Sequence, residues 1–220
     1  FAHTGSLKDP YGRLQRTAMV MNTIGFGARE DADRQTARVR HVHSKIRGAL
    51  REDAGRFPAG TPYRADDPDL LFWIVATLVD SGLLVYQKYV RSMTDDEREH
   101  YWQDWKVIAR LFGVPDSFMP DTVDGFEAYM AAMLASGDLF VSGGARELAI
   151  DIVMKPPVPL AARPLMELVN QITIGLLPEE IRRLYGFAWD PVRGIAVHTG
   201  AEYLKRVVVP LLPERVRIAP

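Results

Sequence analysis

The chain has 220 residues, which fits one all-helical domain or at most two small ones, and its apolar fraction of 47% is enough for a sizeable core. Its 27 Lys and Arg residues nearly cancel its 28 Asp and Glu residues, so the net charge of -1 argues against a nucleic-acid partner. The absence of cysteine excludes disulfides, thiolate nucleophiles and iron–sulfur clusters. We expect a cytoplasmic protein, unless a targeting segment precedes Phe1.

Two helices are predicted in the first fifty residues. The first begins at Asp9-Pro10 and ends near Gly25, and the second runs from Asp31 to Leu50. Along the second helix, four polar side chains recur at positions i, i+4, i+7 and i+11 and therefore share one stripe: Thr36, Arg40, His43 and Arg47.

The third predicted helix, Asp66 to Val90, is the most apolar part of the chain. From Leu70 to Val79 its apolar side chains point in every direction, which is typical of a helix at the centre of a core. Asp80, Ser81 and Gly82 interrupt this run, which is too short and too polar for a transmembrane segment. We therefore predict full burial for the side chains of Leu71, Ile74, Val75 and Leu78.

The rest of the chain also has helical periodicity. We expect helices at Thr94–Phe112, Thr122–Ser136, Ser142–Met154, Leu160–Ile174, Pro178–Tyr185 and Pro191–Val209. Gly137, Gly175 and Gly186 stand where a helix C-cap favours the left-handed conformation. No convincing run with a period of two exists. The predicted fold is all-α, with one globin-like multi-helix domain over residues 1–220 around the buried central helix.

His43 is the histidine with the strongest case for chemistry. It borders the apolar stripe of its helix and has Arg40 one turn before it, an arrangement that suits metal or heme ligation with an anion or oxygen nearby. The alternative is a histidine with satisfied hydrogen bonds at a helix interface, beside solvated arginines. His41 lies on a different face, so the two histidines are not expected to bind one metal together.

Several motifs together resemble one family. They are Asp9-Pro-Tyr-Gly-Arg-Leu-x-Arg-Thr17, Arg40-x-x-His43, Tyr63-x-Ala-x-Asp-Pro68-x-Leu-Leu-x-Trp73, Ala76-Thr-Leu-Val-Asp80, Leu111-Phe-Gly-Val-Pro115 and Leu177-Pro178-x-x-Ile-Arg182-x-x-Tyr-Gly186. Their order and combination are similar to the catalytic domain of the MpaB / rubber oxygenase (latex clearing protein) family, and the similarity covers nearly the whole chain. From the resemblance we expect the family's first helices to precede His3.

This resemblance implies a helical domain that binds heme b and uses dioxygen to oxidise apolar, isoprenoid carbon–carbon double bonds. In the family an Arg and, three residues later, a Lys followed by Thr line the distal side of the heme. The matching residues here are Arg40, His43 and Ser44. The resemblance thus implies a fixed cation at Arg40, an iron ligand at His43 and a hydroxyl at Ser44.

One position departs from the family pattern. The proximal His falls in a Trp-Val-His-Ala-Thr context, whereas this chain has Trp73-Ile-Val75-Ala-Thr77. Either His43 or His3 supplies the axial bond, or the helix is shifted in register, or this member has lost heme. Two hypotheses follow: a heme-dependent oxygenase acting on an apolar small molecule, or a heme-free, non-catalytic protein that binds an apolar ligand or a protein partner.

Overall fold

The computed structural model describes residues 10–154 and 158–213. The predicted ligand His3 lies outside these ranges. Within them the all-α prediction is confirmed, because the only sheet in the described ranges is a two-stranded hairpin. The chain forms two compact units, residues 1–79 with 96–140 and residues 80–95 with 141–220, and each is described by itself. A single domain over residues 1–220 stays a prediction.

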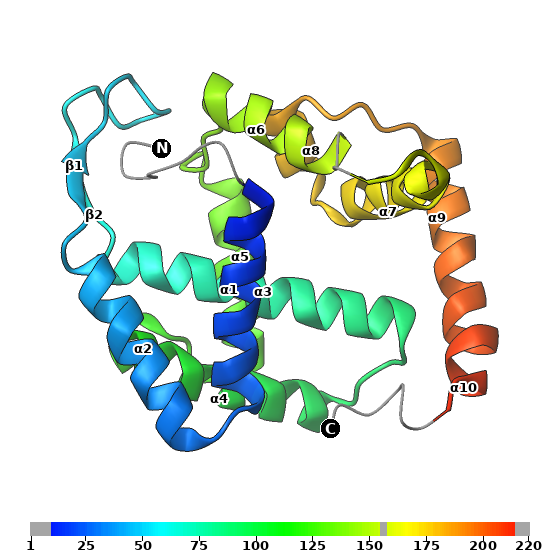
Figure 1. The fold of residues 1–220 in the computed structure, drawn as a ribbon, viewed down its shortest axis with the longest axis horizontal. Helices are drawn as coiled ribbons and strands as arrows, with labels where there is room; N and C mark the ends of the chain where they lie inside the picture. Colours follow the sequence, from blue (N-terminus) through cyan, green and yellow to red (C-terminus); the bar gives the residue numbers. More distant parts are fainter. Residues whose placement is uncertain (1–9, 155–157, 214–220) are drawn as a thin grey trace. The chain divides into compact units, whose positions relative to one another are not determined.

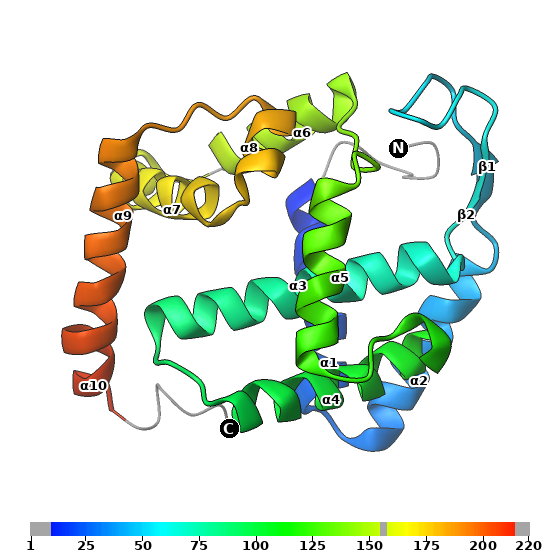
Figure 2. The same ribbon diagram turned by 180° about the vertical axis from the view of Figure 1, so that it is seen from behind.

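The first unit contains four helices, the amino-terminal half of a fifth and the hairpin. In chain order its elements are α1 (Pro10–Phe26), α2 (Arg29–His43), β1 (Arg47–Ala49), β2 (Pro62–Arg64), the first part of α3 (Pro68–Tyr89), α4 (Asp95–Phe112), the 3₁₀ turn η1 (Asp116–Phe118) and α5 (Val123–Ala135). The helices α1 and α5 cross α3 on opposite sides of it (Figures 1 and 2).

The second unit contains the end of α3 and the remaining helices. These are α6 (Gly143–Met154), η2 (Leu160–Ala162), α7 (Arg163–Leu176), α8 (Glu179–Tyr185), α9 (Pro191–Tyr203), the π-helical segment η3 (Leu204–Val208) and α10 (Val209–Leu211). Lys205, in the π-helical segment, donates to the carbonyl of Gln87 at 2.8 Å and so satisfies a backbone acceptor in the last turn of α3.

The central helix exists as predicted, but it is not buried all round. Phe72, Ala76 and Val79 belong to the core, as does Val75, whose exposed fraction is 4%. Leu71 is half-buried, and two of the four residues predicted to be buried are on the surface: Ile74 is 60% exposed and Leu78 is 40% exposed. The helix is apolar on every side, yet within the described ranges only one side is buried. Composition alone cannot distinguish a helix buried all round from one buried on a single side.

Within the described ranges, α3 is also the one helix that is long and apolar enough to cross a membrane. These criteria concern length and composition only, and a core helix of a globular protein meets them too. The burial of Phe72, Val75 and Val79 against protein is what a core helix requires.

The prediction of a helix from Asp31 to Leu50 was wrong at its end. α2 ends at His43, and Ser44 to Ile46 form a turn that leads into β1. β1 pairs with β2 in an antiparallel hairpin, with Arg47 opposite Arg64 and Gly48 opposite Tyr63. A three-residue strand is too short to produce a recognisable alternation in sequence, so the helical spacing of Ile46 and Leu50 was misleading.

Aromatic side chains form the core of the first unit. Trp102 of α4 is fully buried, stacks on Phe126 of α5 at 4.7 Å between ring centroids, and lies 6.4 Å from the ring of Phe72 on α3. Its indole N–H donates to the carbonyl of Pro120 at 3.1 Å. The core therefore joins α3, α4 and α5, and it fixes the start of α3.

Candidate functional site

The inner face of α2 carries His43. Ala32 and Thr36 are buried, and Val39 and His43 are half-buried, at a spacing that places all four on one side of the helix. The Thr36 hydroxyl donates to the Ala32 carbonyl at 2.9 Å, so this buried polar group is satisfied within the helix. His43 is the last residue of this face, at the end of α2.

The His43 imidazole is in a state suited to metal ligation. Burial lowers its pKa below the ordinary value, and the negative charge of Asp66 opposes this effect without reversing it. The ring is therefore mostly neutral at pH 7, as an imidazole ligand must be. Within the described ranges, no side chain or carbonyl forms a hydrogen bond with the ring nitrogens.

Arg40 stands one turn before His43 on the flank of α2. Its side chain is exposed, and its Cδ lies 3.6 Å from the place that a Cβ on Gly113 would occupy, at the end of α4. In the described part of the chain, no carboxylate pairs with its guanidinium. Within the described ranges, Arg40 is thus a cation without an ion-pair partner, one turn from an imidazole without a hydrogen-bond partner.

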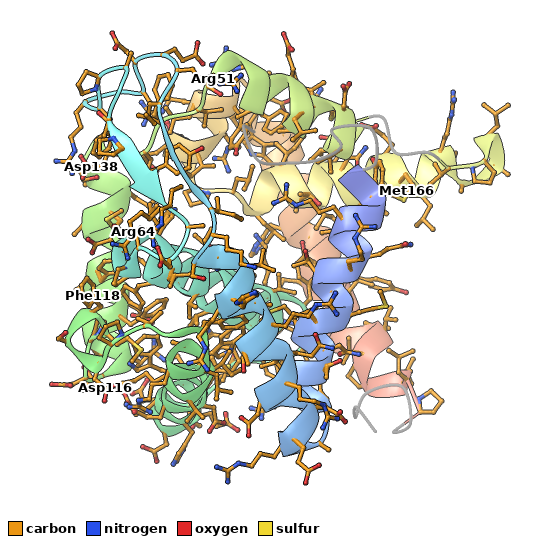
Figure 3. All side chains as sticks on the ribbon, turned by 60° about the vertical axis from the view of Figure 1, so that its left-hand side comes forward. Arg51, Arg64, Asp116, Phe118, Asp138 and Met166 are labelled. Carbon is orange, nitrogen blue, oxygen red and sulfur yellow. The ribbon has the colours of Figure 1, made fainter. Side chains whose placement is uncertain are left out.

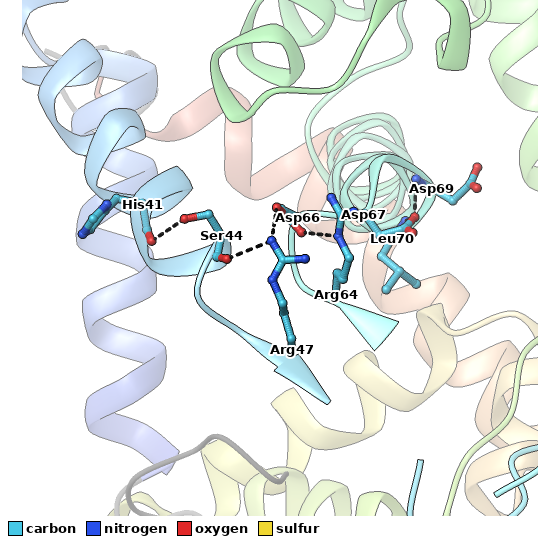
Figure 4. Close-up of polar contacts among 8 residues, drawn as sticks. All are labelled: His41, Ser44, Arg47, Arg64, Asp66, Asp67, Asp69 and Leu70. Carbon is cyan, nitrogen blue, oxygen red and sulfur yellow. Dashed lines mark hydrogen bonds and ion pairs between the residues drawn. The ribbon is translucent and has the colours of Figure 1, made fainter. Parts of the chain in front are cut away.

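Ser44 follows directly and ends the helix. Its hydroxyl donates to the carbonyl of His41 at 2.9 Å, and its own carbonyl accepts from Arg47 at 3.4 Å (Figure 4). Arg40, His43 and Ser44 therefore lie at the end of α2, whereas the sequence placed them in the middle of a longer helix. Arg47 is not on their helical stripe, because the helix has already ended.

The hairpin places charges next to this helix end, a feature that sequence reasoning missed. Arg47 and Arg64 are opposite each other, and both approach Asp66: Arg64 Nε lies 2.9 Å and Arg47 Nη2 lies 3.8 Å from the carboxylate. These bonds hold the pKa of Asp66 below its ordinary value, Arg64 contributing most. The negative charge of Asp66 in turn raises the pKa of His43, against the larger lowering that burial causes.

The hairpin is anchored at its far end as well. Arg56, in the loop between the strands, pairs at 2.8 Å with Asp138, which follows α5 and is labelled in Figure 3. The backbone of Gly55 has a φ of +59°, and a Cβ there would stand 3.4 Å from the Cβ of Phe140. These contacts fix the hairpin to α5, and the Asp66 bonds fix it to the start of α3.

Possible ligands for a metal are few. The described ranges contain no group of three or more His, Asp and Glu side chains that could hold a metal ion, so a metal bound only by protein is not supported. A heme needs just one or two axial ligands from the protein. The neutral, half-buried and unpartnered His43 fits one such ligand, whereas the buried Val75 of α3 offers no donor atom.

Comparison with known protein families assigns nearly the whole chain to a family. The sequence model of the family described as "ER-bound oxygenase mpaB/B'/Rubber oxygenase, catalytic domain" matches residues 2–209. No curated protein and no solved structure matches the chain. Because the match covers nearly all of the 220 residues, the chain belongs to the family of the MpaB and rubber oxygenase catalytic domains.

Proposed function

We propose that the protein is a heme-dependent oxygenase that acts on an apolar, isoprenoid-type small molecule with dioxygen. Membership of an oxygenase family supports the reaction class. The observation that carries the cofactor assignment is His43, a half-buried imidazole whose pKa is lowered by burial. Heme, when bound, would supply the redox and dioxygen-binding chemistry that amino-acid side chains lack.

In this proposal each residue at the end of α2 has one role. His43 holds the iron through a neutral ring nitrogen. Arg40 offers a planar, permanently charged guanidinium for an anionic oxygen, either a heme propionate or bound dioxygen. Ser44 offers a hydroxyl, which would have to turn from the carbonyl of His41 in order to serve a ligand.

Heme reconstitution of His43→Ala tests the ligand assignment. We expect the wild-type protein to show a Soret band, and His43→Ala to lose it while its far-UV circular dichroism stays unchanged. The control is His41→Ala, because His41 is two residues away, exposed and on another face of α2. A Soret band of equal height and position in His43→Ala would contradict the assignment.

A second function is favoured by one specific observation. Val75 is buried on α3 where the family has its proximal histidine, so this member could hold an apolar ligand or a protein partner without iron. A wild-type protein that retains no heme after reconstitution would establish this reading. The variant Val75→His should then gain or strengthen a Soret band if the remainder of the heme site is intact.

A further inference from the structure

The exposed side of α3 is apolar over more than two turns. Leu70, Ile74 and Leu78 follow each other at intervals of four residues and form one stripe, with exposed fractions of 48%, 60% and 40%. They lie opposite the residues that α3 contributes to the core. Large contiguous apolar surfaces on a protein usually mark a binding site, because leaving them in water costs free energy.

Two arginines stand at the beginning of this stripe. Arg47 and Arg64 are directly opposite each other in the hairpin, where like charges repel, and both side chains are more than half exposed. Both arginines form an ion pair with the same carboxylate, that of Asp66. Most of their guanidinium N–H groups remain open to solvent, and this planar arrangement suits a carboxylate or a phosphate.

Two more carboxylates follow closely in the sequence, and the charge of Asp67 also acts on Arg64. Asp67 accepts hydrogen bonds from the backbone N–H groups of Asp69 and Leu70, at 3.0 and 3.5 Å, and is stabilised by the positive end of α3. Asp69 leaves α3 on the side away from the two arginines, whereas Leu70 leaves it on their side (Figure 4). The two exposed guanidinium groups and the apolar stripe therefore begin at the same end of the helix.

We propose that this face binds a linear amphipathic molecule, with its carboxylate or phosphate on Arg47 and Arg64 and its aliphatic chain along Leu70, Ile74 and Leu78. From Pro68 to Leu78 the helix advances about 15 Å, at roughly 1.5 Å per residue, which gives room for a chain of ten or more carbons. The inference deepens the proposed function, on which it rests for the apolar substrate, by adding an anionic head group.

Charge complementarity selects this ligand over a second copy of the chain. Two copies that covered the stripe with the same face would bring two arginine pairs into one interface, where like charges repel. A neutral lipid or alcohol would cover the stripe but would leave the arginines without an anion. An amphipathic anion satisfies both parts of the face.

Calorimetric titration of the full chain with three dodecyl compounds tests the proposal. We expect dodecanoate and dodecyl phosphate to bind, and dodecanol to bind at least about tenfold more weakly because it lacks the charge-assisted hydrogen bonds. The ratio of the two anions identifies the head group. Equal affinities for dodecanoate and dodecanol, or no binding of any of the three, would overturn the proposal.

Variants separate the head site from the tail site. Arg47→Gln with Arg64→Gln should reduce the affinity for the anions to that for dodecanol, and Ile74→Gln should weaken all binding compounds. The matched controls are Arg56→Gln, an ion-paired arginine of the same hairpin, and Val107→Gln, an exposed apolar residue of α4. If the double variant loses helicity, Arg47→Lys with Arg64→Lys keeps the charges and should weaken anion binding by less than the Gln pair.

Two further measurements test whether a second copy of the chain or a bilayer covers this face instead. Size-exclusion chromatography that shows a dimer dissociated by Ile74→Gln would assign the face to a second copy, and sedimentation with neutral phosphatidylcholine vesicles that depends on Ile74 would assign it to a bilayer. Either result overturns the proposal. Titration of the wild-type protein with dodecanoate before and after heme reconstitution separates the two proposals, because a protein that retains no heme and still binds dodecanoate would disprove only the proposed function.

Discussion

The indole of Trp189 lies against the backbone of Gly175. A Cβ on Gly175 would stand 2.6 Å from the ring, which is closer than van der Waals contact allows. The prediction that Gly175 ends its helix in the left-handed conformation was wrong, because it lies inside α7 and has no positive φ. Gly137 and Gly186 do have positive φ values, of 75° and 72°, as predicted. Position 175 requires glycine because a larger side chain would collide with Trp189, and not because the backbone there has a left-handed conformation.

Gly175→Ala should therefore destabilise the protein, by about 1–3 kcal/mol, as is usual for overpacking. The indole cannot move aside easily, because Gly194 and the guanidinium of Arg182 hold its other side, the latter 5.5 Å from the ring. Urea unfolding measures the effect. The control is Gly200→Ala in α9, where a Cβ would meet nothing within 4 Å and helix propensity predicts a gain of roughly 0.5–1 kcal/mol. Equal effects of the two substitutions would refute this account.

Most of the helical architecture could be predicted from the sequence. Pro68 in a first turn, Thr122 as an N-cap and the positive-φ glycines mark helix ends through local chemistry, and the Thr122 side chain does accept a hydrogen bond from the Gly125 N–H. What could not be predicted depends on contacts between elements. The size restriction at Gly175 and the exposed side of α3 follow from which elements meet, and periodicity carries no information about that.

Trp102 provides a second test of the packing. Trp102→Phe should lower the free energy of unfolding by roughly 1–3 kcal/mol, because the Pro120 carbonyl loses its buried donor. A smaller ring would also leave space beside Phe126. Val107→Ala on the exposed side of α4 should cost less than about 0.5 kcal/mol. A Phe variant as stable as the wild-type protein would show that the indole N–H bond contributes little.

The carboxylate of Glu99 links stability to pH. It accepts from the Val123 N–H at 2.8 Å and from Gln103 at 2.6 Å, and these bonds, the backbone bond first, hold its pKa below the ordinary value. A group with a lowered folded-state pKa contributes stability above its unfolded pKa and loses it as pH falls through the folded pKa. Glu99→Gln should thus be less stable than wild type at pH 7, and the difference should shrink below about pH 4.3, the ordinary Glu value.

Thermal unfolding of both proteins across pH 2.5–7 checks this expectation, which concerns only the acid side of the profile. Asp104→Asn is a suitable control, since Asp104 is an exposed carboxylate of the same helix. A constant difference between Glu99→Gln and wild type over the whole range would mean that the charge of Glu99 contributes nothing.

The candidate site was only partly predictable, because part of it depends on contacts between elements that are distant in sequence. Arg40, His43 and Ser44 are within one helical turn, so a spacing argument finds them together. Asp66 is some twenty residues away in sequence, and its charge acts on His43 only because the chain turns into a hairpin after α2. The available signal for the hairpin was a pair of glycines, Gly48 inside the first strand and Gly60 just before the second. The apolar spacing of Ile46 and Leu50, which suggests a helix, concealed this signal.

Adjacent residues on α3 give the sharpest test of which side of that helix is buried. Val75→Ala should cost about 1–3 kcal/mol, because its side chain is 4% exposed and a cavity would remain. Ile74→Ala, one residue earlier, should cost less than about 1 kcal/mol, although it removes more carbon atoms, because Ile74 is 60% exposed. Guanidinium unfolding of both variants measures the two losses. If Ile74→Ala were the more damaging change, α3 would be covered by protein on its second side, and the amphipath-binding face proposed above would not be accessible.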